Sequence, residues 1–400
     1  MLSVAEAKTR ILEAFEHLPA ETISLAEADG RVLAEDVKAR LTQPPWPVSA
    51  MDGYAVRGAD VAKAPAELRQ IGVVHAGGRY EGKVGPGEAV RIFTGAPLPE
   101  GADTVVIQEN VEAEGTRVSV RHATTLGRNV RPAGLDFKTG EVGLEAGRRL
   151  DARAIGFAAA MNVPWLRVTR KPRVAVLATG DEIVMPGEPI GDNQIVSSNA
   201  LALIAAIRRF GGEPISLGIA LDNAGSLTAL AADARGADLL VTTGGASVGE
   251  HDLVRDVLGG IGLQLDFWKI AMRPGKPLMF GRLGDTRLLG LPGNPVSTLV
   301  CAILFLKPAI GRMLGLTEDG DQSETALVDV DLTANDERQD YVRASLKLGP
   351  DGQIHVAPFA KQDSSMMSLM AKAGCLIVRP PRAPAAKAGS LVPIIRLDDL

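Results

Sequence analysis

Apolar residues recur at helical or strand spacing along most of the chain, and changes in that spacing divide it into four regions. The first helix is predicted to begin at the capping-box pair Ser3 and Glu6 and to end before Pro19. Two further helices are predicted, over 25–35 and over 151–161. We expect the helix over 151–161 to pack back on the N-terminal helix, which gives a discontinuous helical linker domain, residues 1–42 and 137–170.

Residues 43–136 have a different texture. Short runs of β-branched residues, separated by Gly and Pro, occupy Ala89–Phe93, Thr104–Gln108 and Arg117–Arg121. This pattern predicts a small β lobe.

Residues 171–316 alternate between apolar strands and amphipathic helices. The predicted strands are Arg173–Ala178, Ile215–Ile219, Asp238–Thr242 and Leu288–Leu291, and the predicted helices are Asn199–Phe210, Ser226–Arg235, Asp252–Leu258 and Asn294–Leu314. Such alternation indicates right-handed βαβ units, hence a central three-layer α/β domain with a mostly parallel sheet. Residues 317–400 have short alternating runs with a hairpin turn at 349–352, and they predict a C-terminal β-barrel-like domain. The expected fold class is multi-domain α/β plus β.

Composition narrows the class of protein. The 400 residues are 46% hydrophobic and 23% charged, which is typical of a soluble globular protein. The net charge is -5 and no Lys or Arg cluster stands out, which argues against nucleic acid. Cys301 and Cys375 are the only cysteines and cannot build a disulfide framework. The charged N-terminus is not typical of a signal peptide, and no apolar run reaches the ~20 residues of a membrane span, so a cytoplasmic location is expected.

Four polar loops follow the predicted strands of the α/β domain, at 178–182, 220–223, 242–252 and 291–297. Ligands of open α/β sheets bind beyond the carboxyl ends of the strands. The loop over 242–252 contains Gly244, Gly245, Ser247 and Gly249, and glycines before a helix N-terminus allow backbone N–H groups to bind an anion. The alternative is a Gly-rich turn without a ligand. Asn294 is expected to cap the helix that carries Ser297 in its first turn, where a phosphate or oxyanion contact is plausible.

Three carboxylates come from separate strand ends: Glu182, Asp222 and Asp252. Converging carboxylates hold Mg²⁺ beside phosphates, so these residues are the candidate metal ligands. Each one alone is more typical of a surface or capping acid.

The segment 268–277 contains three cations, Lys269, Arg273 and Lys276. Pro274 and Pro277 restrict its backbone, so Arg273 and Lys276 are expected to form a rigid oxyanion receptor. A solvated basic loop is the equally weighted alternative. The sequence contains neither an evident Ser/His/Asp set nor a Walker A pattern.

Several ordered motifs together identify a family. They are Ser49–Ala55, Thr94–Pro99, Gly101–Asp103 with Gln108-Glu109, Ala178–Glu182, Thr243–Gly245 with Ser247–Gly249, Arg273–Pro277 and Leu291–Ser297. With them the sequence resembles the molybdopterin molybdotransferases, or molybdenum insertases, the bacterial relatives of the gephyrin E domain. The resemblance covers nearly the whole chain.

The resemblance implies an enzyme that inserts molybdenum from molybdate into adenylylated molybdopterin, releasing AMP, with Mg²⁺ as cofactor. It implies a homodimer whose site lies between the α/β domain of one subunit and the β lobe of the other. Other cofactor-biosynthesis proteins and molybdoenzyme chaperones are possible partners.

The resemblance also implies residue roles. The expected catalytic residues are Glu182, Asp222, Asp252, Lys269, Arg273 and Lys276. The expected substrate-binding residues are Asp52, Thr94, Asp136, Thr179, Gly244, Gly245, Ser247, Gly249 and Asn294. The expected molybdate-binding residues are Arg273, Lys276, Pro277, Ser297, Arg343 and Ser364. Leu135 stands where many relatives have glutamate, and some relatives have lysine in place of Arg273.

Three alternatives remain open at this point. The chain could be an adenylyltransferase that makes the capped pterin, although the lobes on either side of residues 171–315 argue against it. It could be a non-catalytic, gephyrin-like scaffold. Without the resemblance, a sugar-phosphate or nucleotide enzyme would also fit.

Overall fold

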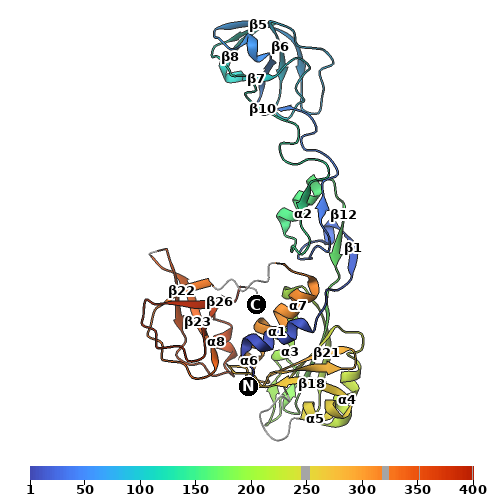
Figure 1. Ribbon diagram of the computed structural model, residues 1–400, viewed down its shortest axis with the longest axis vertical. Coiled ribbons are helices and arrows are strands. Elements are labelled where there is room, and N and C mark those ends of the chain that lie inside the picture. The colour runs from blue at the N-terminus through green and yellow to red at the C-terminus, as the bar shows by residue number, and fades with distance from the viewer. Residues whose placement is uncertain (245–252, 318–323, 351, 399) are drawn as a thin grey trace.

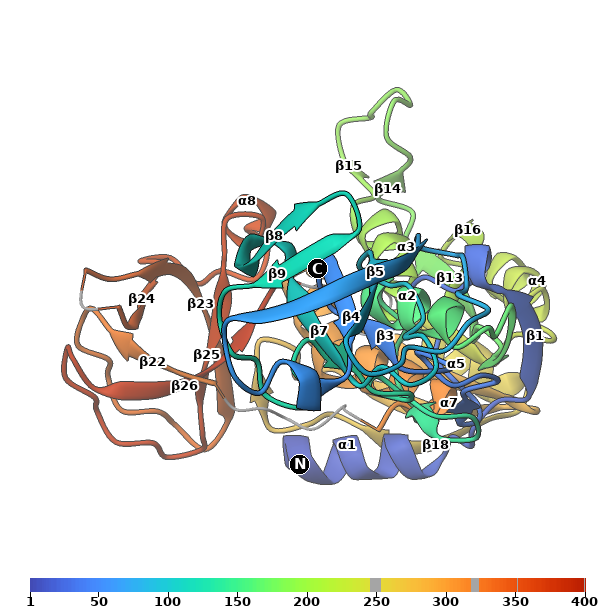
Figure 2. The same cartoon turned by 90° about the horizontal axis from the view of Figure 1, so that it is seen from above.

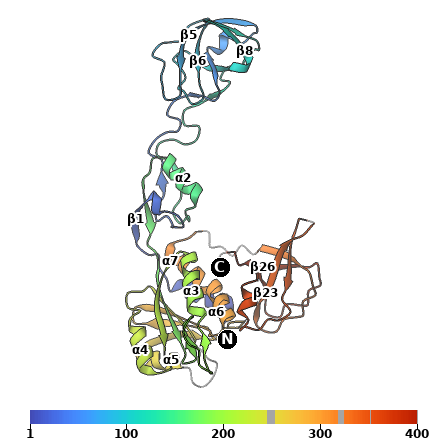
Figure 3. The same ribbon diagram turned by 180° about the vertical axis from the view of Figure 1, so that it is seen from behind.

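The molecule is elongated, with distinct bodies along its length (Figure 1). The computed structural model describes residues 1–244, 253–317, 324–350, 352–398 and 400. A β lobe forms one end, a small middle domain follows, and the α/β domain and the C-terminal domain lie side by side at the other end (Figures 1 and 3).

The α/β domain is built on a six-stranded sheet of order β16-β13-β17-β21-β20-β18. Its strands are β13 (Arg173–Thr179), β16 (Glu213–Ala220), β17 (Leu239–Thr243), β18 (Leu263–Trp268), β20 (Met279–Leu283) and β21 (Thr286–Leu291). The four strands predicted from the sequence are mutually parallel, whereas β20 runs antiparallel to both of its neighbours, β21 and the edge strand β18. The prediction of a mostly parallel sheet is therefore confirmed.

Helices cover both faces of this sheet. They are α3 (Asn199–Phe210), α4 (Ala224–Ala232), α5 (Leu253–Gly260), α6 (Pro295–Cys301) and α7 (Lys307–Leu314). Successive residues of a strand point to opposite faces. Accordingly Val174 and Val176 are buried in a core with α3, α6 and α7, while Ala175 and Leu177 are buried in a core with α4. The three predicted layers are present.

The helical run Pro295–Leu314 is continuous through a π-helical segment, Ala302–Leu306. Among the helices of the described residues, only this one is long and apolar enough to cross a membrane. The sequence analysis expected no such run. However, 83% of its apolar stretch is buried inside the fold. Its apolar surface is therefore already covered by the protein, as in the central helix of a core.

The C-terminal domain is a closed five-stranded barrel. Its strands are β22 (Glu324–Val328), β23 (Gln339–Leu348), β24 (Ile354–Pro358), β25 (Cys375–Arg379) and β26 (Leu391–Arg396). They are ordered β23-β24-β22-β26-β25, and pairing of β25 with β23 closes the barrel. The predicted hairpin at 349–352 joins β23 to β24. A short strand of the α/β domain, β19 (Met272–Arg273), pairs with the start of β23, so the two domains share backbone hydrogen bonds.

The middle domain is made of two chain segments, as predicted, but it is less helical than predicted. It contains β1 (Ala20–Ser24) paired with β12 (Trp165–Thr169), β2 (Val37–Lys38) paired with β11 (Val142–Leu144), and α2 (Ala152–Ala160). The predicted helix over 25–35 is wrong, since only Leu25–Glu27 forms a 3-10 turn. After Gly30, Arg31, Val32 and Leu33 are all buried. Burial of three consecutive residues differs from the single buried stripe of an amphipathic surface helix, which the sequence pattern had suggested.

The N-terminal helix α1 (Val4–Glu13) has the predicted capping box, but its packing partner differs from the prediction. Ala7 and Ile11 are buried in the core that contains α6 and α7, whereas Ala154 and Ala158 of α2 are buried in the middle domain. The expected contact between α2 and α1 is therefore wrong, and α1 belongs structurally with the α/β domain.

The β lobe is a six-stranded sheet of order β7-β4-β6-β5-β9-β8. Its strands are β4 (Gly53–Val56), β5 (Ala66–Val74), β6 (Glu88–Ile92), β7 (Thr104–Ile107), β8 (Val111–Glu114) and β9 (Arg117–Val120). A two-stranded ribbon, β3 (Val48–Ser49) with β10 (Val130–Arg131), lies where the lobe joins the connection to the middle domain (Figure 1). The three sequence-predicted strands of this lobe are present.

Candidate active site at the carboxyl ends of the parallel strands

The four predicted polar loops meet at one edge of the α/β sheet. Thr179 at the end of β13 is paired in register with Ala220 of β16, and the preceding residue of β13 is paired with Thr243 of β17. Thr243 is in turn paired with Leu291 of β21. The amino ends of these strands face the middle domain, since β13 directly follows β12. The loops therefore lie at the end of the domain that is remote from the β lobe.

Close backbone packing fixes the start of the glycine-rich loop. Gly244 has φ +93°, and a Cβ on it would lie 2.4 Å from the carbonyl oxygen of Thr179. A larger residue would therefore separate two adjacent loops. Thr179 is buried and its Oγ1 has no hydrogen-bond partner among the described residues.

Asn199, at the start of α3, ties two of these loops together. Its Nδ2 donates to Oγ1 of Thr243 at 3.0 Å and to the carbonyl oxygen of Gly293 at 2.7 Å. Asn199 is not among the site residues predicted from the sequence. The available signal was its position at a helix start within the same α/β unit, where Asn is usually interpreted as a cap.

The loop before α6 connects the α/β domain to the barrel. Asn294 occupies the N-cap position and Pro295 follows it at N1, as predicted, but the Asn294 side chain makes no capping hydrogen bond. Its Nδ2 instead donates to Oγ of Ser364 at 2.9 Å, and the N–H of Val296 donates to the carbonyl oxygen of Ser364 at 3.1 Å. The structure therefore places Ser364 beside the first turn of α6, where the family resemblance requires it.

Arg343 supports that contact from inside the barrel. The residue is 1% exposed. Its guanidinium donates to the carbonyl oxygens of Asp363 at 2.8 Å and Met366 at 3.1 Å. Burial lowers the pKa of Arg343 from its ordinary value. These contacts hold the loop that carries Ser364, so the structure supports a positioning role for Arg343.

The loop that carries Lys276 packs against the same helix as Ser297. A Cβ on Gly275 would lie 2.6 Å from Sγ of Cys301, and Cys301 is four residues after Ser297, on the same face of α6. Ser297 is 4% exposed and Lys276 is half-buried, and neither side chain forms a hydrogen bond or ion pair with another described residue. Burial raises the pKa of Cys301, which stays a neutral thiol. The structure thus packs the loop that carries this cation against the helix that carries this hydroxyl, and neither group has a competing partner among the described residues.

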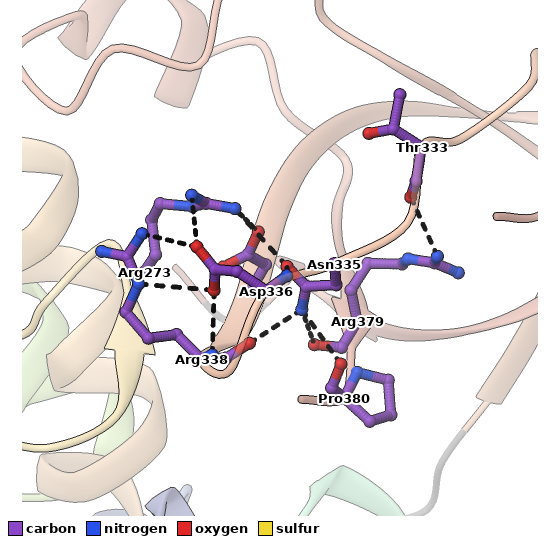
Figure 4. Close-up of polar contacts among 8 residues, drawn as sticks. Arg273, Thr333, Asn335, Asp336, Arg338, Arg379 and Pro380 are labelled. Atoms are coloured by element: carbon purple, nitrogen blue, oxygen red, sulfur yellow. Dashed lines mark hydrogen bonds and ion pairs between the residues drawn. The ribbon is translucent and has the colours of Figure 1, made fainter. Parts of the chain in front are cut away.

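Arg273 has a different environment from Lys276 (Figure 4). Its guanidinium forms ion pairs with Asp336, at 3.2 Å, and with Asp340, both from the barrel. Burial raises the pKa of Asp340, while hydrogen bonds from Arg338 lower the pKa of Asp336 to about 2. The positive charge of Arg273 is therefore compensated, and the expectation of a rigid pair of free cations is wrong. Of the two, Lys276 alone has no ion pair with a described residue.

Lys269 is also engaged. Its Nζ lies 3.8 Å from the ring centroid of Trp268, and its backbone has φ +95°. The guanidinium of Arg255 lies 4.7 Å from the same ring centroid. Cation–π contacts of this kind hold the side chain of Lys269 against the end of β18.

The acidic candidates are only partly assembled in the described residues. Glu182 and Asp222 follow adjacent strands and are exposed, and the N–H of Asp222 donates to Oδ1 of Asp181 at 2.8 Å. Glu182 lies at the base of the projecting segment that contains β14 (Ile183–Val184) and β15 (Ile195–Val196) (Figure 2). Within the described residues no group of three His, Cys, Asp or Glu could hold a metal ion. Asp252, the third candidate ligand, is not among them.

Gly245, Ser247 and Gly249, like Asp252, lie outside the described residues.

The remaining candidates lie in the β lobe or beside it. Oδ1 of Asp52 accepts hydrogen bonds from the N–H and Oγ1 of Thr94, both at 2.8 Å, and these bonds lower the pKa of Asp52. Asp136 lines a pocket of about 690 Å³ that also includes Trp46 and Arg131. In one chain these residues are separated from the carboxyl-end loops by the whole middle domain (Figure 1).

Comparison with known proteins identifies the family of each part of the chain. Three family profiles match in order: "MoeA N-terminal region (domain I and II)" over residues 2–162, "Probable molybdopterin binding domain" over 175–312, and "MoeA C-terminal region (domain IV)" over 325–397.

Individual relatives match over nearly the full length. A molybdopterin molybdenumtransferase of Nostoc sp. is 37% identical, covering 90% of this chain and 85% of the relative. That of Haemophilus influenzae is 35% identical, covering 98% of both chains. The crystal structure of a molybdopterin biosynthesis moeA protein from Pyrococcus horikoshii superposes with a TM-score of 0.84 at 31% identity, covering 99% of both chains. The chain therefore belongs to the molybdopterin molybdenumtransferases, a family of transferases.

Proposed function

We propose that this protein transfers molybdenum from molybdate to adenylylated molybdopterin and releases AMP and molybdenum cofactor. The observation that carries the proposal is the contact between the α6 loop and the barrel, where Asn294 and Ser364 meet beside Ser297. Together with the match of molybdenumtransferases along the whole chain, it supports a site shared by the two domains.

The chemistry required of the protein is mostly electrostatic. Molybdate is a tetrahedral dianion, and Lys276 supplies a positive charge without a competing carboxylate among the described residues. Ser297 supplies a hydroxyl donor from the first turn of α6, where helix N–H groups also favour an anion. Charge-assisted hydrogen bonds of this kind orient an oxyanion without covalent chemistry. The resulting catalysis consists of positioning and charge stabilisation.

Arg273 contributes through the barrel in this proposal. Its ion pairs with Asp336 and Asp340, together with the pairing of β19 and β23, hold the barrel against the α/β domain. Docking of the barrel in turn sets the position of Ser364. The molybdate contact expected for Arg273 would require it to leave these carboxylates.

Mg²⁺ is part of the proposal, with Glu182, Asp222 and Asp252 as its ligands. The chemistry of the donor set fits, because Mg²⁺ prefers carboxylate oxygens and keeps several waters. When bound, the ion would supply charge neutralisation at the phosphate groups of the substrate. Glu182 and Asp222 are both solvent-accessible at neighbouring strand ends, which suits a partly hydrated cation.

A homodimer is the further part of the proposal. Asp52, Thr94 and Asp136 are remote from the carboxyl-end loops of their own chain, so they can join a site with those loops only through a second copy. The cytoplasmic location expected from the sequence belongs to the same proposal.

The decisive experiment is a reconstitution with adenylylated molybdopterin, Mg²⁺ and molybdate, in which AMP release and active cofactor are measured. We expect AMP release to depend on molybdate. Consumption of ATP with formation of adenylylated molybdopterin would instead identify an adenylyltransferase. Absence of turnover with retained pterin binding would identify a scaffold, and either result would overturn the proposal.

A further inference from the structure

A pocket of about 530 Å³ lies where the middle domain meets the amino ends of the parallel strands, at the end of the sheet opposite the carboxyl-end loops. It is lined by residues of both bodies: Glu21, Arg31, Arg170, Lys171, Arg173, Arg208, Gly212, Glu213 and Pro214. Five of these side chains are cationic and two are acidic. We call this set the junction pocket.

Internal ion pairs neutralise only part of this charge. Arg31 pairs with Glu21, and Arg170 forms two hydrogen bonds with Asp238, at 2.8 and 2.6 Å. The lining has three further cations, Lys171, Arg173 and Arg208. Its one further acidic residue is Glu213. The junction pocket therefore carries an excess of positive charge in a protein whose net charge is -5.

Arg31 provides a rigid donor in the wall of the pocket. The residue is 8% exposed, and both of its hydrogen bonds come from Nη2, to Glu21 and to the carbonyl oxygen of Thr169. Its Nε is buried and has no hydrogen-bond partner among the described residues. Glu21 already compensates the charge of Arg31, so the excess positive charge of the pocket comes from Lys171, Arg173 and Arg208.

Lys171 and Arg208 reach the same pocket from exposed positions. Neither side chain forms an ion pair with a described residue. Arg208 lies in the last turn of α3, where a cation also complements the helix dipole. That explanation accounts for Arg208 alone, and it does not account for Lys171.

We propose that the junction pocket binds a phosphate-class oxyanion, either free or carried by a nucleotide. Arginine forks and a lysine are the groups that recognise such anions. Because Arg31 belongs to the middle domain and Arg208 to the α/β domain, a bound anion bridges the two bodies. The proposal is independent of the molybdate chemistry at the carboxyl-end loops.

The test is isothermal titration calorimetry of the full-length protein with inorganic pyrophosphate, ADP and adenosine. Lys276→Ala removes the oxyanion residue at the carboxyl-end loops and should leave one pyrophosphate site intact. Arg208→Ala and Lys171→Ala should each weaken that site about tenfold or more, since a hydrogen bond to a charged group is worth about 1.5–3 kcal/mol. Lys63→Ala, an exposed lysine of the β lobe, is the matched control and should change nothing. Both junction variants alter exposed side chains, so the fold should persist.

The outcomes separate the sources of the anion. Tighter binding of ADP than of pyrophosphate, lost in Arg208→Ala, identifies a nucleotide phosphate; the reverse order identifies a free anion. Binding of adenosine as tightly as ADP would overturn the proposal. So would loss of all pyrophosphate binding in Lys276→Ala, or unchanged binding in both junction variants. The proposed molybdenum transfer can fail without affecting any of these readouts.

Discussion

Two regions of this molecule hold the residues implied by the family resemblance, and they differ in how completely one chain assembles them. At the carboxyl ends of the parallel strands, Ser364 of the barrel lies beside the first turn of α6, which carries Ser297, and the loop that carries Lys276 packs against the same helix. At the β lobe, Asp52 and Thr94 bind each other at the opposite end of the molecule. The first region is assembled within one chain, whereas the second would join it only in the proposed homodimer. Variants in the two regions should therefore behave differently.

The largest effect is expected at Lys276. In Lys276→Ala the oxyanion loses its uncompensated cation, so molybdate-dependent AMP release should fall about 100-fold, in line with a charged contact worth up to about 3 kcal/mol. Binding of adenylylated molybdopterin should change much less. The measurement is the molybdate dependence of AMP release, with Lys63→Ala as the control. Equal molybdate dependence in Lys276→Ala and the parent protein would contradict the prediction.

Mixing two inactive variants tests whether the β lobe of one chain and the carboxyl-end loops of another form one site. If a site combines the β lobe of one chain with the carboxyl-end loops of another, Asp52→Ala and Lys276→Ala chains should complement each other. After mixed refolding at equal amounts, about a quarter of the sites should be intact, because half of the dimers are mixed and each has one complete site. AMP release is compared with that of each variant alone. No recovery in dimers shown to be mixed would place both residues in one chain's site or outside it.

A smaller effect is expected from Arg343→Met, which keeps the buried apolar stem but removes the guanidinium. Two carbonyl oxygens, those of Asp363 and Met366, lose their donors, at a cost of about 3 kcal/mol in free energy of unfolding. Chemical denaturation measures this loss. The molybdate KM should rise while pterin binding persists, since Ser364 would shift. An unchanged KM at reduced stability would show that Arg343 acts only on the barrel.

The smallest effect concerns the hydrogen bonds and ion pairs of Asp336. The pKa of Asp336 is lowered to about 2 from 3.8, chiefly by hydrogen bonds from Arg338, so its stabilising contribution is complete above about pH 4. That contribution is lost as the pH falls from about 4 to 2. Asp336→Asn should therefore be less stable than the parent protein at pH 7, and the difference should shrink over that acidic range. Denaturant midpoints at pH 7 and pH 3 measure it, and a constant difference would argue against the ion pairs.

Much of the α/β domain and its site follows from local sequence. The helix over 199–210 was predicted to the residue, because a regular apolar period ends at Gly211, whose φ is +98°. The strand ends were also predicted closely, so the four loops were placed correctly at one edge of the sheet. These features depend on periodicity, turn residues and the geometry of parallel strands.

Features that depend on contacts distant in sequence were not predictable in the same way. The carboxylates that bind Arg273 are more than 60 residues away, and their distance from it is set by the docking of the barrel. Asn294 has the pattern of a helix cap, yet its side chain binds Ser364, 70 residues later. Asn199 was not predicted for the same reason, because its side chain acts by forming hydrogen bonds to both Thr243 and Gly293.

The sequence alone determined the alternation of strands and helices, the polar loops at the strand ends and, through the ordered motifs, the family. Tertiary structure decided which charges are paired: it paired Arg273 with Asp336 and Asp340 but gave Lys276 no ion pair with a described residue. It also packed α1 with α7 rather than with α2. The physical reason is that backbone conformation follows from neighbouring residues, whereas ion pairs and helix packing depend on which surfaces the domains present to one another.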